Sequence, residues 1–300
     1  MKDILVNMTR KHDFLICVDS DGCVFDNMEL KHKECFCPAT VNVWNLQGIS
    51  RYAREAAEFV NLYSTTRGVN RFPALIRTLE LLGAREEVRQ RGYVCPDLTS
   101  LKEWVKKTPR LSAAALDEYV RSLEAPDAIL SQAAAWSKEV DANVAHIVRG
   151  VKPFPGVWEA LSAFMAFADV VIVSATPHEA IVREWGEHDL LRFVTEVAGQ
   201  ELGSKAECIR KANSGHYAPD HVLMIGDAPG DYAAALENGV LFYPIVPGKE
   251  VESWEKAADS LTAQLRTGSY QGANMDRAVA ELRKVLLEAP PWNREAGQTA

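Results

Sequence analysis

Short runs of apolar residues recur along the chain and predict strands. The three strongest runs cover residues 14–19, 169–175 and 221–227. Each is almost continuously apolar, a pattern typical of strands that are buried on both faces of a parallel sheet. Weaker runs at 193–198 and 240–246 are further strand candidates. The chain is therefore expected to contain a parallel sheet.

Helical spacing fills the intervals between the later runs. Helices are predicted over residues 156–167, 177–188, 205–212 and 231–238. The last one stops before Gly239, and glycine is common directly after a helix. Strands that alternate with helices at this spacing indicate an open α/β sheet, so the predicted fold class is α/β with a Rossmann-like core.

Residues 27–150 have a different pattern, with no comparable strand run and several helical ones. The apolar positions of 129–148 keep helical spacing. Pro73 is predicted as the first residue of another helix, and Ser100 with Glu103 is predicted to form a capping box at the start of a third. This part of the chain is therefore predicted to be an all-helical insert.

The predicted organisation is a discontinuous core with an inserted cap. The core comprises residues 1–26 and 151–300, and the cap comprises residues 27–150. A chain of 300 residues suits two domains of roughly 150 residues each. The tail at 289–300 is expected to be mostly irregular.

Composition narrows the classes of protein that fit. The sequence is 47% hydrophobic and 25% charged, as in soluble globular domains. Its 41 acidic and 33 basic residues give a net charge of −8, which argues against binding nucleic acid or anionic membrane by bulk charge. No run approaches the roughly 20 apolar residues of a membrane span, and the first apolar cluster is too short for a signal peptide. The predicted location is cytoplasmic.

Cysteine usage agrees with that location. In a reducing compartment the six cysteines are expected to be thiols. His32, Cys35 and Cys37 form a small cluster that resembles part of a zinc site. Because no second Cys/His pair completes a tetrahedral set, thiols in a helical region are the preferred interpretation.

Polar residues follow the three strongest runs at the points where the strands should end. The segments are DSDG at 19–22, SATP at 174–177 and GDAPGD at 226–231. Since the carboxyl ends of parallel strands meet at one edge of a sheet, these segments should converge. Carboxylate oxygens without Cys or His favour Mg²⁺. The neighbouring hydroxyls and the N–H groups at a helix start are suited to a phosphate group.

Lys205 adds a positive charge to this set. It follows Gly-Ser at a predicted helix start, where its ammonium group can reach a phosphoryl group. The combined set has a nucleophilic carboxylate, a second acid two residues later, a hydroxyl, a lysine and a metal site. Such a set is suited to phosphoryl transfer by covalent catalysis, which divides one difficult step into two.

Four ordered motifs resemble those of the haloacid dehalogenase superfamily of hydrolases. They are CVDSDGCVFD, VVIVSAT, Lys205 and VLMIGDAPGD, and the resemblance covers about residues 12–26 and 151–248. The helical insert matches the cap that this family places between its first two motifs. By this likeness, Asp19 would be the nucleophile that forms an aspartyl-phosphate. Asp21 would protonate the leaving group and later activate water.

The same resemblance implies further roles. Ser174 and Lys205 would hold the phosphoryl group. Mg²⁺ would be bound by Asp19, the Asp21 carbonyl and Asp227, with Asp231 in support. The dehalogenase branch lacks the second acid of the first motif, so its presence here favours a phosphatase. Cys23 stands where Thr or Val is commoner in the family, which is a minor departure.

Several residues have a simpler alternative interpretation. Asp231 fits equally the first turn of a helix, and Thr176 fits an N-cap. Arginine pairs bidentately with carboxylate or phosphate, so two arginines of the 64–72 segment are candidates for reading a second anionic group, although both can instead be solvated or paired with acids. The predicted phosphate and substrate contacts are Gly22, Ala175, Thr176, Arg67 and Arg71.

The predicted function is Mg²⁺-dependent hydrolysis of a small soluble phosphomonoester through an aspartyl-phosphate. The expected partner is a small phosphorylated metabolite, with no nucleic acid and no membrane, and no oligomeric state is predicted. A phosphosugar mutase of the same family is one alternative. A binding or regulatory module without turnover is another, and the intact set of Asp19, Asp21, Lys205 and Asp227 argues against it.

Overall fold

A computed structural model describes residues 4–293, and in this range the chain forms two units. The core unit contains the residues up to Met28 together with Gly150–Leu286. The helical unit contains Glu29–Arg149 together with residues 287–293. Residues 287–293 thus pack with the helical unit, whereas the sequence pattern had grouped them with the core. The predicted irregular tail continues into 294–300, which lies outside the described residues.

The core unit is built on one five-stranded sheet in which every neighbouring pair is parallel. The strand order is β3-β2-β1-β4-β5. Four strands fall within the apolar runs and β2 begins one residue before its run, so the predicted parallel α/β core is confirmed. The strands are β1 (Phe14–Val18), β2 (Ala168–Val173), β3 (Glu196–Ala198), β4 (Val222–Gly226) and β5 (Leu241–Pro244).

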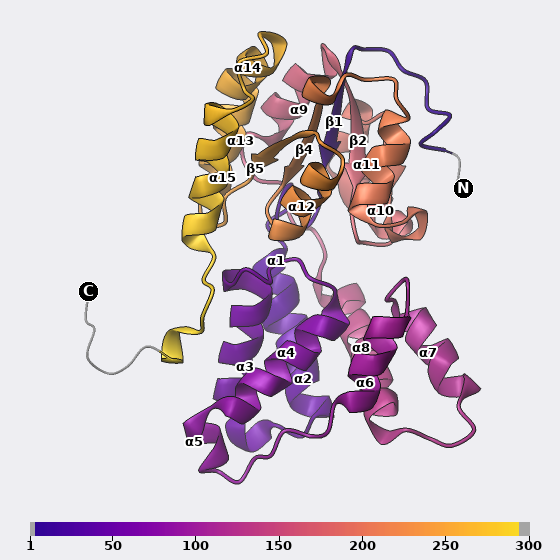
Figure 1. Ribbon diagram of the computed structural model, residues 1–300, viewed down its shortest axis with the longest axis vertical. Helices are drawn as coiled ribbons and strands as arrows, with labels where there is room; N and C mark the ends of the chain where they lie inside the picture. The colour runs from indigo at the N-terminus through magenta and orange to yellow at the C-terminus, as the bar shows by residue number, and fades with distance from the viewer. Residues whose placement is uncertain (1–3, 294–300) are drawn as a thin grey trace. The chain divides into compact units, whose positions relative to one another are not determined.

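Helices cover both faces of this sheet (Figure 1). Successive strand residues alternate between two apolar clusters, as Ile16 and Val18 show on one face and Leu15 and Cys17 on the other. The first cluster includes residues of α9 (Val157–Met165), α10 (His178–Glu187), α13 (Glu250–Lys256) and α14 (Thr262–Arg266). The second includes residues of α11 (Lys205–Asn213), α12 (Pro229–Glu237) and α15 (Ala273–Val285). The core is therefore a three-layer sandwich.

A buried carboxylate lies at the amino-terminal edge of the sheet. Asp169, near the start of β2, is 1% exposed. It accepts backbone N–H bonds from Lys11 at 3.0 Å and His12 at 3.1 Å, and a hydroxyl bond from Tyr217 at 2.9 Å. These donors stabilise the buried charge, and they hold the segment before β1 against β2.

Among its described residues the helical unit contains helices and no strand, as predicted. Its main apolar cluster includes Phe72, Trp104 and Trp136, which come from three different helices. The helices are α1 (Met28–Leu30), which starts in the last residue of the core unit, α2 (Cys37–Val43), α3 (Ser50–Glu58), α4 (Arg71–Ala84), α5 (Glu86–Arg89), α6 (Thr99–Lys107), α7 (Ala113–Ser122) and α8 (Ala128–Ile147).

Two predicted helix starts differ from the structure. Helix α4 begins before Pro73, because the Asn70 side chain caps it by accepting the Phe72 N–H. The capping box predicted at Ser100 and Glu103 is wrong. The Ser100 hydroxyl donates to Asp127, and Glu103 pairs with Lys107 one turn later.

All six cysteines are free thiols, as expected. Five are buried, and Cys95 is half-buried against Gly83, where an added Cβ would lie 2.6 Å from the Cys95 Cβ. Within residues 4–293, no helix combines the length and the apolar character that crossing a membrane requires.

Candidate active site

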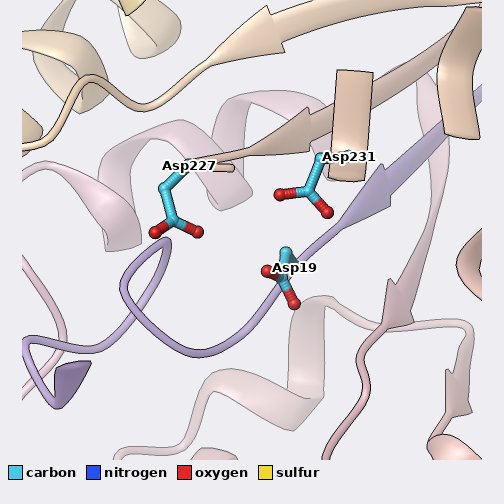
Figure 2. Close-up of side chains that lie close together, drawn as sticks. All are labelled: Asp19, Asp227 and Asp231. Atoms are coloured by element: carbon cyan, nitrogen blue, oxygen red, sulfur yellow. The ribbon is translucent and has the colours of Figure 1, made fainter. Parts of the chain in front are cut away.

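Three carboxylates gather at the carboxyl-terminal edge of the sheet (Figure 2). Asp19 directly follows β1, and its N–H continues the strand pairing by donating to the Ile225 carbonyl of β4 at 2.9 Å. Asp227 directly follows β4, and Asp231 lies in the first turn of α12. The strand order reverses between β1 and β4, which is where open α/β sheets bind ligands. All three side chains are buried, with ligand atoms within 4.8 Å of one another.

Lys205 reaches this cluster from the start of α11. Its Nζ lies 2.7 Å from Asp19 Oδ2 and also contacts Asp231 Oδ1. The helix start is fixed by a capping box in which Ser204 Oγ accepts the Glu207 N–H and the Glu207 carboxylate accepts the Ser204 N–H. Lys205 therefore stands at a fixed helix start, as the sequence predicts.

The pKa values of Asp19 and Lys205 depend on burial and on the excess of acids over cations in the cluster. Burial raises the pKa of Asp19 to about 8, the Lys205 ammonium opposes this shift, and the nearby acids add to it. Burial lowers the pKa of Lys205, but the attraction of Asp19 and Asp231 outweighs it and raises that pKa overall. Three acids around one ammonium leave an excess of two negative charges when all are ionised. Such an excess, carried on oxygen atoms only, suits a hard divalent cation.

Asp21 is held by two hydrogen bonds from the core unit. Asn27 Nδ2 donates to its Oδ1 at 2.6 Å, and Thr176 Oγ1 donates to its Oδ2 at 2.9 Å. Thr176 does not act as an N-cap, because α10 has Pro177 at that position. Its own N–H donates to Ser174 Oγ at 3.2 Å. The structure thus brings the first and second motifs together through Thr176.

The other residues predicted for phosphate binding lie in the same two loops. Gly22 follows Asp21 and has φ of +69°, a conformation that glycine adopts without strain. Its N–H donates to the Phe25 carbonyl at 3.0 Å. Ala175 is exposed and lies between Ser174 and Thr176.

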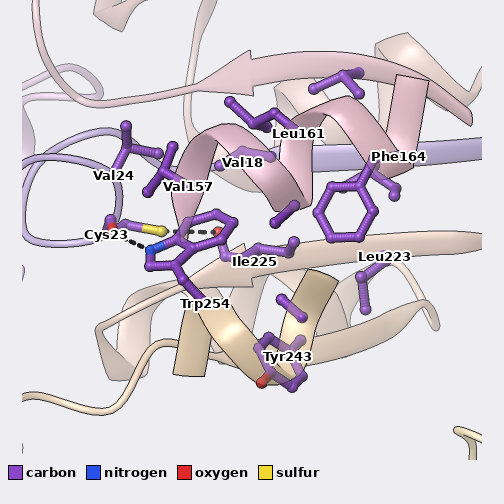
Figure 3. Close-up of a cluster of buried hydrophobic side chains, with 14 of the residues drawn as sticks. Val18, Cys23, Val24, Val157, Leu161, Phe164, Leu223, Ile225, Tyr243 and Trp254 are labelled. Atoms are coloured by element: carbon purple, nitrogen blue, oxygen red, sulfur yellow. Dashed lines mark hydrogen bonds between the residues drawn. The ribbon is translucent and has the colours of Figure 1, made fainter. Parts of the chain in front are cut away.

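Two buried tryptophans anchor the loop that carries Asp19 and Asp21. Trp185 Nε1 donates to Ser20 Oγ at 3.0 Å. Trp254 Nε1 donates to the Cys23 carbonyl at 2.7 Å, and the Cys23 thiol contacts the Ile225 carbonyl at 3.8 Å (Figure 3). Cys23 is fully buried, and burial raises the pKa of its thiol. The residue that departs from the commoner Thr or Val thus serves to pack the loop.

Gly226 makes room for Asp231. A Cβ at position 226 would lie 2.3 Å from the Asp231 carboxyl carbon. Asp231 also accepts the Ala228 N–H at 3.1 Å, so it supports the start of α12 while contacting Lys205. Both interpretations of Asp231, as a helix-start acid and as a member of the cluster, therefore describe its position.

The two arginines predicted to read a second anion have different surroundings in the helical unit. Arg71 Nη1 contacts Asp141 Oδ1 at 2.7 Å and Ser137 Oγ at 3.0 Å, which joins α4 to α8. Arg67 follows the π-helical segment Phe59–Tyr63, is 6% exposed and donates from Nη1 to the Leu62 carbonyl at 3.1 Å. Both arginines thus have an acid nearby, since Arg71 pairs with Asp141 and Arg67 helps to lower the pKa of Glu29.

Asn27 also belongs to this region, although the sequence left open whether it faces the cleft or lies at a solvated helix start. It is fully buried and contacts Asp21 directly. Its Oδ1 also accepts the Gly22 N–H at 3.2 Å, so one side chain fixes two consecutive loop residues. The signal in the sequence was a short polar residue immediately after the first motif.

Comparison with solved structures finds proteins of similar fold. The chain is similar to a predicted phosphoglycolate phosphatase from Haemophilus somnus, with 14% identity, 85% of this chain and 100% of that chain covered, and a TM-score of 0.52. It is also similar to a predicted phosphatase from Clostridium acetobutylicum, with 15% identity, coverage of 86% and 100%, and a TM-score of 0.45. A haloacid dehalogenase-like hydrolase from Streptococcus pneumoniae gives 14% identity, coverage of 83% and 97%, and a TM-score of 0.44.

These likenesses concern the fold. No protein-family model matches the sequence, and no curated protein matches it either. The fold of the chain is similar to that of the Haemophilus somnus structure, and the parallel sheet is the α/β core that the sequence predicts. At 13–15% identity the activity has to be argued from the site itself.

Proposed function

We propose that the protein hydrolyses a small phosphomonoester in a Mg²⁺-dependent reaction, with Asp19 as the nucleophile. One observation carries the proposal. The Asp19 carboxylate lies between the Ser20 N–H, at 2.8 Å, and the Lys205 ammonium, within a group of buried acids at the edge of the sheet. A carboxylate held in this way keeps its orientation while the lysine attracts a phosphoryl group.

The proposed reaction has two displacements at phosphorus. In the first, a carboxylate oxygen of Asp19 forms a bond to phosphorus, the bond from phosphorus to the ester oxygen breaks, and Asp21 gives that oxygen a proton. In the second, water attacks the same phosphorus, Asp21 accepts a proton from it, and the bond to Asp19 breaks. The products are an alcohol and inorganic phosphate, and Asp19 and Asp21 return to their starting forms.

The remaining residues bind and orient in this scheme. Lys205, Ser174 and the N–H groups that follow Ser174 would hold the phosphoryl oxygens. Asn27 and Thr176 orient the Asp21 carboxyl through the bonds described above. Mg²⁺ would be held by Asp19, Asp227 and the Asp21 carbonyl, with Asp231 in support, and supplies charge neutralisation when bound.

The helical unit offers a reason for expecting a small anionic substrate. Arg67 is a buried cation of this unit, and a guanidinium group can pair bidentately with a carboxylate or a phosphate. The name of the similar Haemophilus somnus structure refers to phosphoglycolate, in which a carboxylate accompanies the phosphate. We therefore propose a phosphomonoester with a second anionic group.

Phosphate release from a panel of esters tests the activity. The panel contains phosphoglycolate, sugar mono- and bisphosphates and p-nitrophenyl phosphate, each with Mg²⁺ and with chelator. A hydrolase releases phosphate from at least one ester, and its phosphoryl group should be trapped on Asp19 by rapid quenching. Interconversion of sugar phosphate isomers without release would favour the mutase. If the protein neither releases phosphate nor interconverts isomers, a binding module remains as the interpretation.

Substitution of Arg67 and Arg71 tests whether the substrate carries a second anionic group. Arg67→Ala should raise KM for an ester with a second anionic group by about 10- to 100-fold, the range expected for a hydrogen bond between charged groups. Hydrolysis of p-nitrophenyl phosphate, which lacks that group, should stay nearly unchanged. Arg71→Ala is the matched control, because Arg71 joins α4 to α8 through Asp141 and Ser137. Equal losses on both esters in Arg67→Ala would contradict anion reading.

A further inference from the structure

A cavity of about 360 Å³ lies at the amino-terminal edge of the core sheet. It is formed by the segment that leads into β1, the first residue of β1, the residue before β2 and the last residue of α14, all within the core unit. Its volume falls near the lower end of the roughly 300–1,000 Å³ found for small-molecule sites. The residues that line it are Lys11, His12, Asp13, Phe14, Phe167 and Arg266.

The lining of this cavity is positively charged, although the whole chain has a net charge of −8. Lys11 and Arg266 are exposed, and within residues 4–293 neither side chain pairs with an acid. The charge of Asp13 is already matched, because Arg10 Nη2 lies 3.0 Å from its Oδ1. Two positive charges at the cavity are thus left without a counter-charge, and such a lining attracts anions.

His12 is held in one orientation beside these two cations by a buried acid. Its Nδ1 lies 3.3 Å from Oδ1 of Asp169, which is itself fixed by the Lys11 N–H and the Tyr217 hydroxyl. The contact with Asp169 uses Nδ1, so Nε2 is the ring nitrogen that remains for a ligand. In the described part of the chain, Nε2 has no hydrogen-bond partner. His12 therefore offers a polar atom at a defined position.

Two phenylalanine rings give the cavity an apolar wall. Phe14 and Phe167 meet edge-on with centroids 5.3 Å apart, and both are only half-buried. The Arg266 guanidinium lies 5.8 Å from the Phe167 centroid, so a cation and a ring face stand together. His221 already stacks on Phe14, with centroids 4.1 Å apart and an interplanar angle of 18°. A flat ring is the kind of group that packs against such a wall.

We propose that this cavity binds a small organic anion in which a phosphate or carboxylate group is attached to an aromatic ring. The anionic group would lie among the three basic side chains, and the ring would pack against Phe14 and Phe167. The site is separate from the candidate active site, because Phe14 and Asp19 lie at opposite ends of β1, about 16 Å apart along the strand. Its ligand is therefore bound without being hydrolysed.

The test is a binding titration followed by backbone amide signals in NMR spectra, with chelator present. Phenylphosphonate and benzoate carry both a ring and an anionic group, inorganic phosphate lacks the ring, and benzyl alcohol lacks the charge. Phenylphosphonate has a carbon–phosphorus bond in place of an ester, so the proposed hydrolysis cannot consume it. Shifts at residues 11–14 report the cavity, and shifts at residues 174–176 report the candidate active site.

Arg266→Ala is the main variant, and Arg192→Ala is its matched control. Both arginines are exposed residues of the core unit, and each lies over an aromatic ring, at 5.8 Å and 5.7 Å. Arg192 differs in being paired with Asp189 at 2.9 Å and in lying outside the lining of the cavity. Lys11→Ala removes the other cation that lacks an acidic partner. A thermal melt of each variant checks that the fold is kept.

The expected result is saturable binding of at least one ring-bearing anion at residues 11–14. Arg266→Ala and Lys11→Ala should each raise its Kd by about 10-fold or more, the range for a hydrogen bond between charged groups. Arg192→Ala should leave the Kd unchanged. Inorganic phosphate and benzyl alcohol should each bind at least about 10-fold more weakly than that anion, because each makes only one of the two kinds of contact.

Three results would overturn the proposal. No shift at residues 11–14 with about 10 mM of either ring-bearing anion would remove the site, since a Kd far above 1 mM means a negligible affinity. Equal Kd values in the wild type and Arg266→Ala would show that the positive charge is not used. Binding of inorganic phosphate or benzyl alcohol as tightly as the ring-bearing anions would reject the ligand class. None of these results touches the reaction proposed at Asp19, which phosphate release measures separately.

Discussion

Buried aspartates at the two edges of the core sheet have different surroundings. At the amino-terminal edge, Asp169 is surrounded by backbone N–H groups and a tyrosine hydroxyl. At the carboxyl-terminal edge, Asp19 lies among other acids with a single lysine. The first arrangement satisfies a charge, and the second gathers charge of one sign. Burial alone therefore does not distinguish the two acids, and the excess of like charge around Asp19 is what supports the function proposed for it.

The largest expected effect comes from the same substitution at the two edges. Asp19→Asn should lower kcat by at least about 1,000-fold, because a neutral amide is a poor nucleophile. Asp169→Asn should keep nearly full turnover, since its side chain contacts no predicted substrate-binding residue. Steady-state phosphate release and a thermal melt would be measured for both. Comparable losses of kcat in two folded proteins would remove the distinction between the edges.

Within the acidic edge, the Mg²⁺ requirement should distinguish Asp227 from Asp231. Chelator should abolish turnover, and Mg²⁺ should restore it. Asp227→Ala should raise the Mg²⁺ concentration for half-maximal activity more than Asp231→Ala, for which about 10- to 100-fold is expected of a supporting group. A Mg²⁺ titration of activity measures both. Full activity in chelator would contradict the metal site, and equal shifts would contradict only the division of roles.

The free energy of unfolding should be lowered more by Asp169→Asn than by Asp19→Asn, the reverse of the order expected for kcat. Asp169→Asn places an amide opposite N–H donors and should lower the free energy of unfolding by about 2 kcal/mol, as expected for hydrogen bonds to a charged group. In metal-free protein, Asp19→Asn should be neutral or stabilising near pH 8, because the raised pKa of Asp19 means that its ionised form opposes folding there. Urea unfolding in chelator would compare the two. Stabilisation by Asp169→Asn would show that the amino-terminal edge is not satisfied.

The smallest expected effect concerns the orientation of Asp21. Thr176→Val removes one hydrogen bond to this carboxyl and should lower kcat by about 2- to 10-fold with little change in KM, the range for one neutral hydrogen bond. Thr262→Val is the control, since its hydroxyl also donates one hydrogen bond, to the Ala257 carbonyl at 3.0 Å, and neither residue belongs to the candidate site. Single-turnover kinetics would isolate the first step. A loss confined to KM would instead indicate substrate binding by Thr176.

The strand ends and Lys205 could be predicted because neighbouring residues in the sequence determine them. The strand ends were predictable because a continuous apolar run marks a strand buried on both faces, and the residue after it then lies at the functional edge. Lys205 was predictable for a similar reason, since Gly-Ser before it marks a helix start. Both inferences need only neighbouring residues.

Features that depend on long-range packing were not predictable in the same way. The contact between Asn27 and Asp21 requires the loop shape that Trp185 and Trp254 impose from distant helices. Arg71 has its partner 70 residues away, and the sequence left its role open. Leu287 meets the 63–65 loop through backbone groups, which carry no sequence signal at all.

The thiols of this chain give it a ready site for chemical labelling. Burial raises the pKa of Cys37 to about 12 and that of Cys17 still further, so these sulfurs should resist alkylation in the folded protein. Burial raises the pKa of Cys95 too, but Cys95 is the one cysteine that is partly exposed, and it lies in the helical unit. A maleimide dye should therefore attach at a single position of the wild-type chain. Its emission would then follow events in the helical unit without an engineered cysteine.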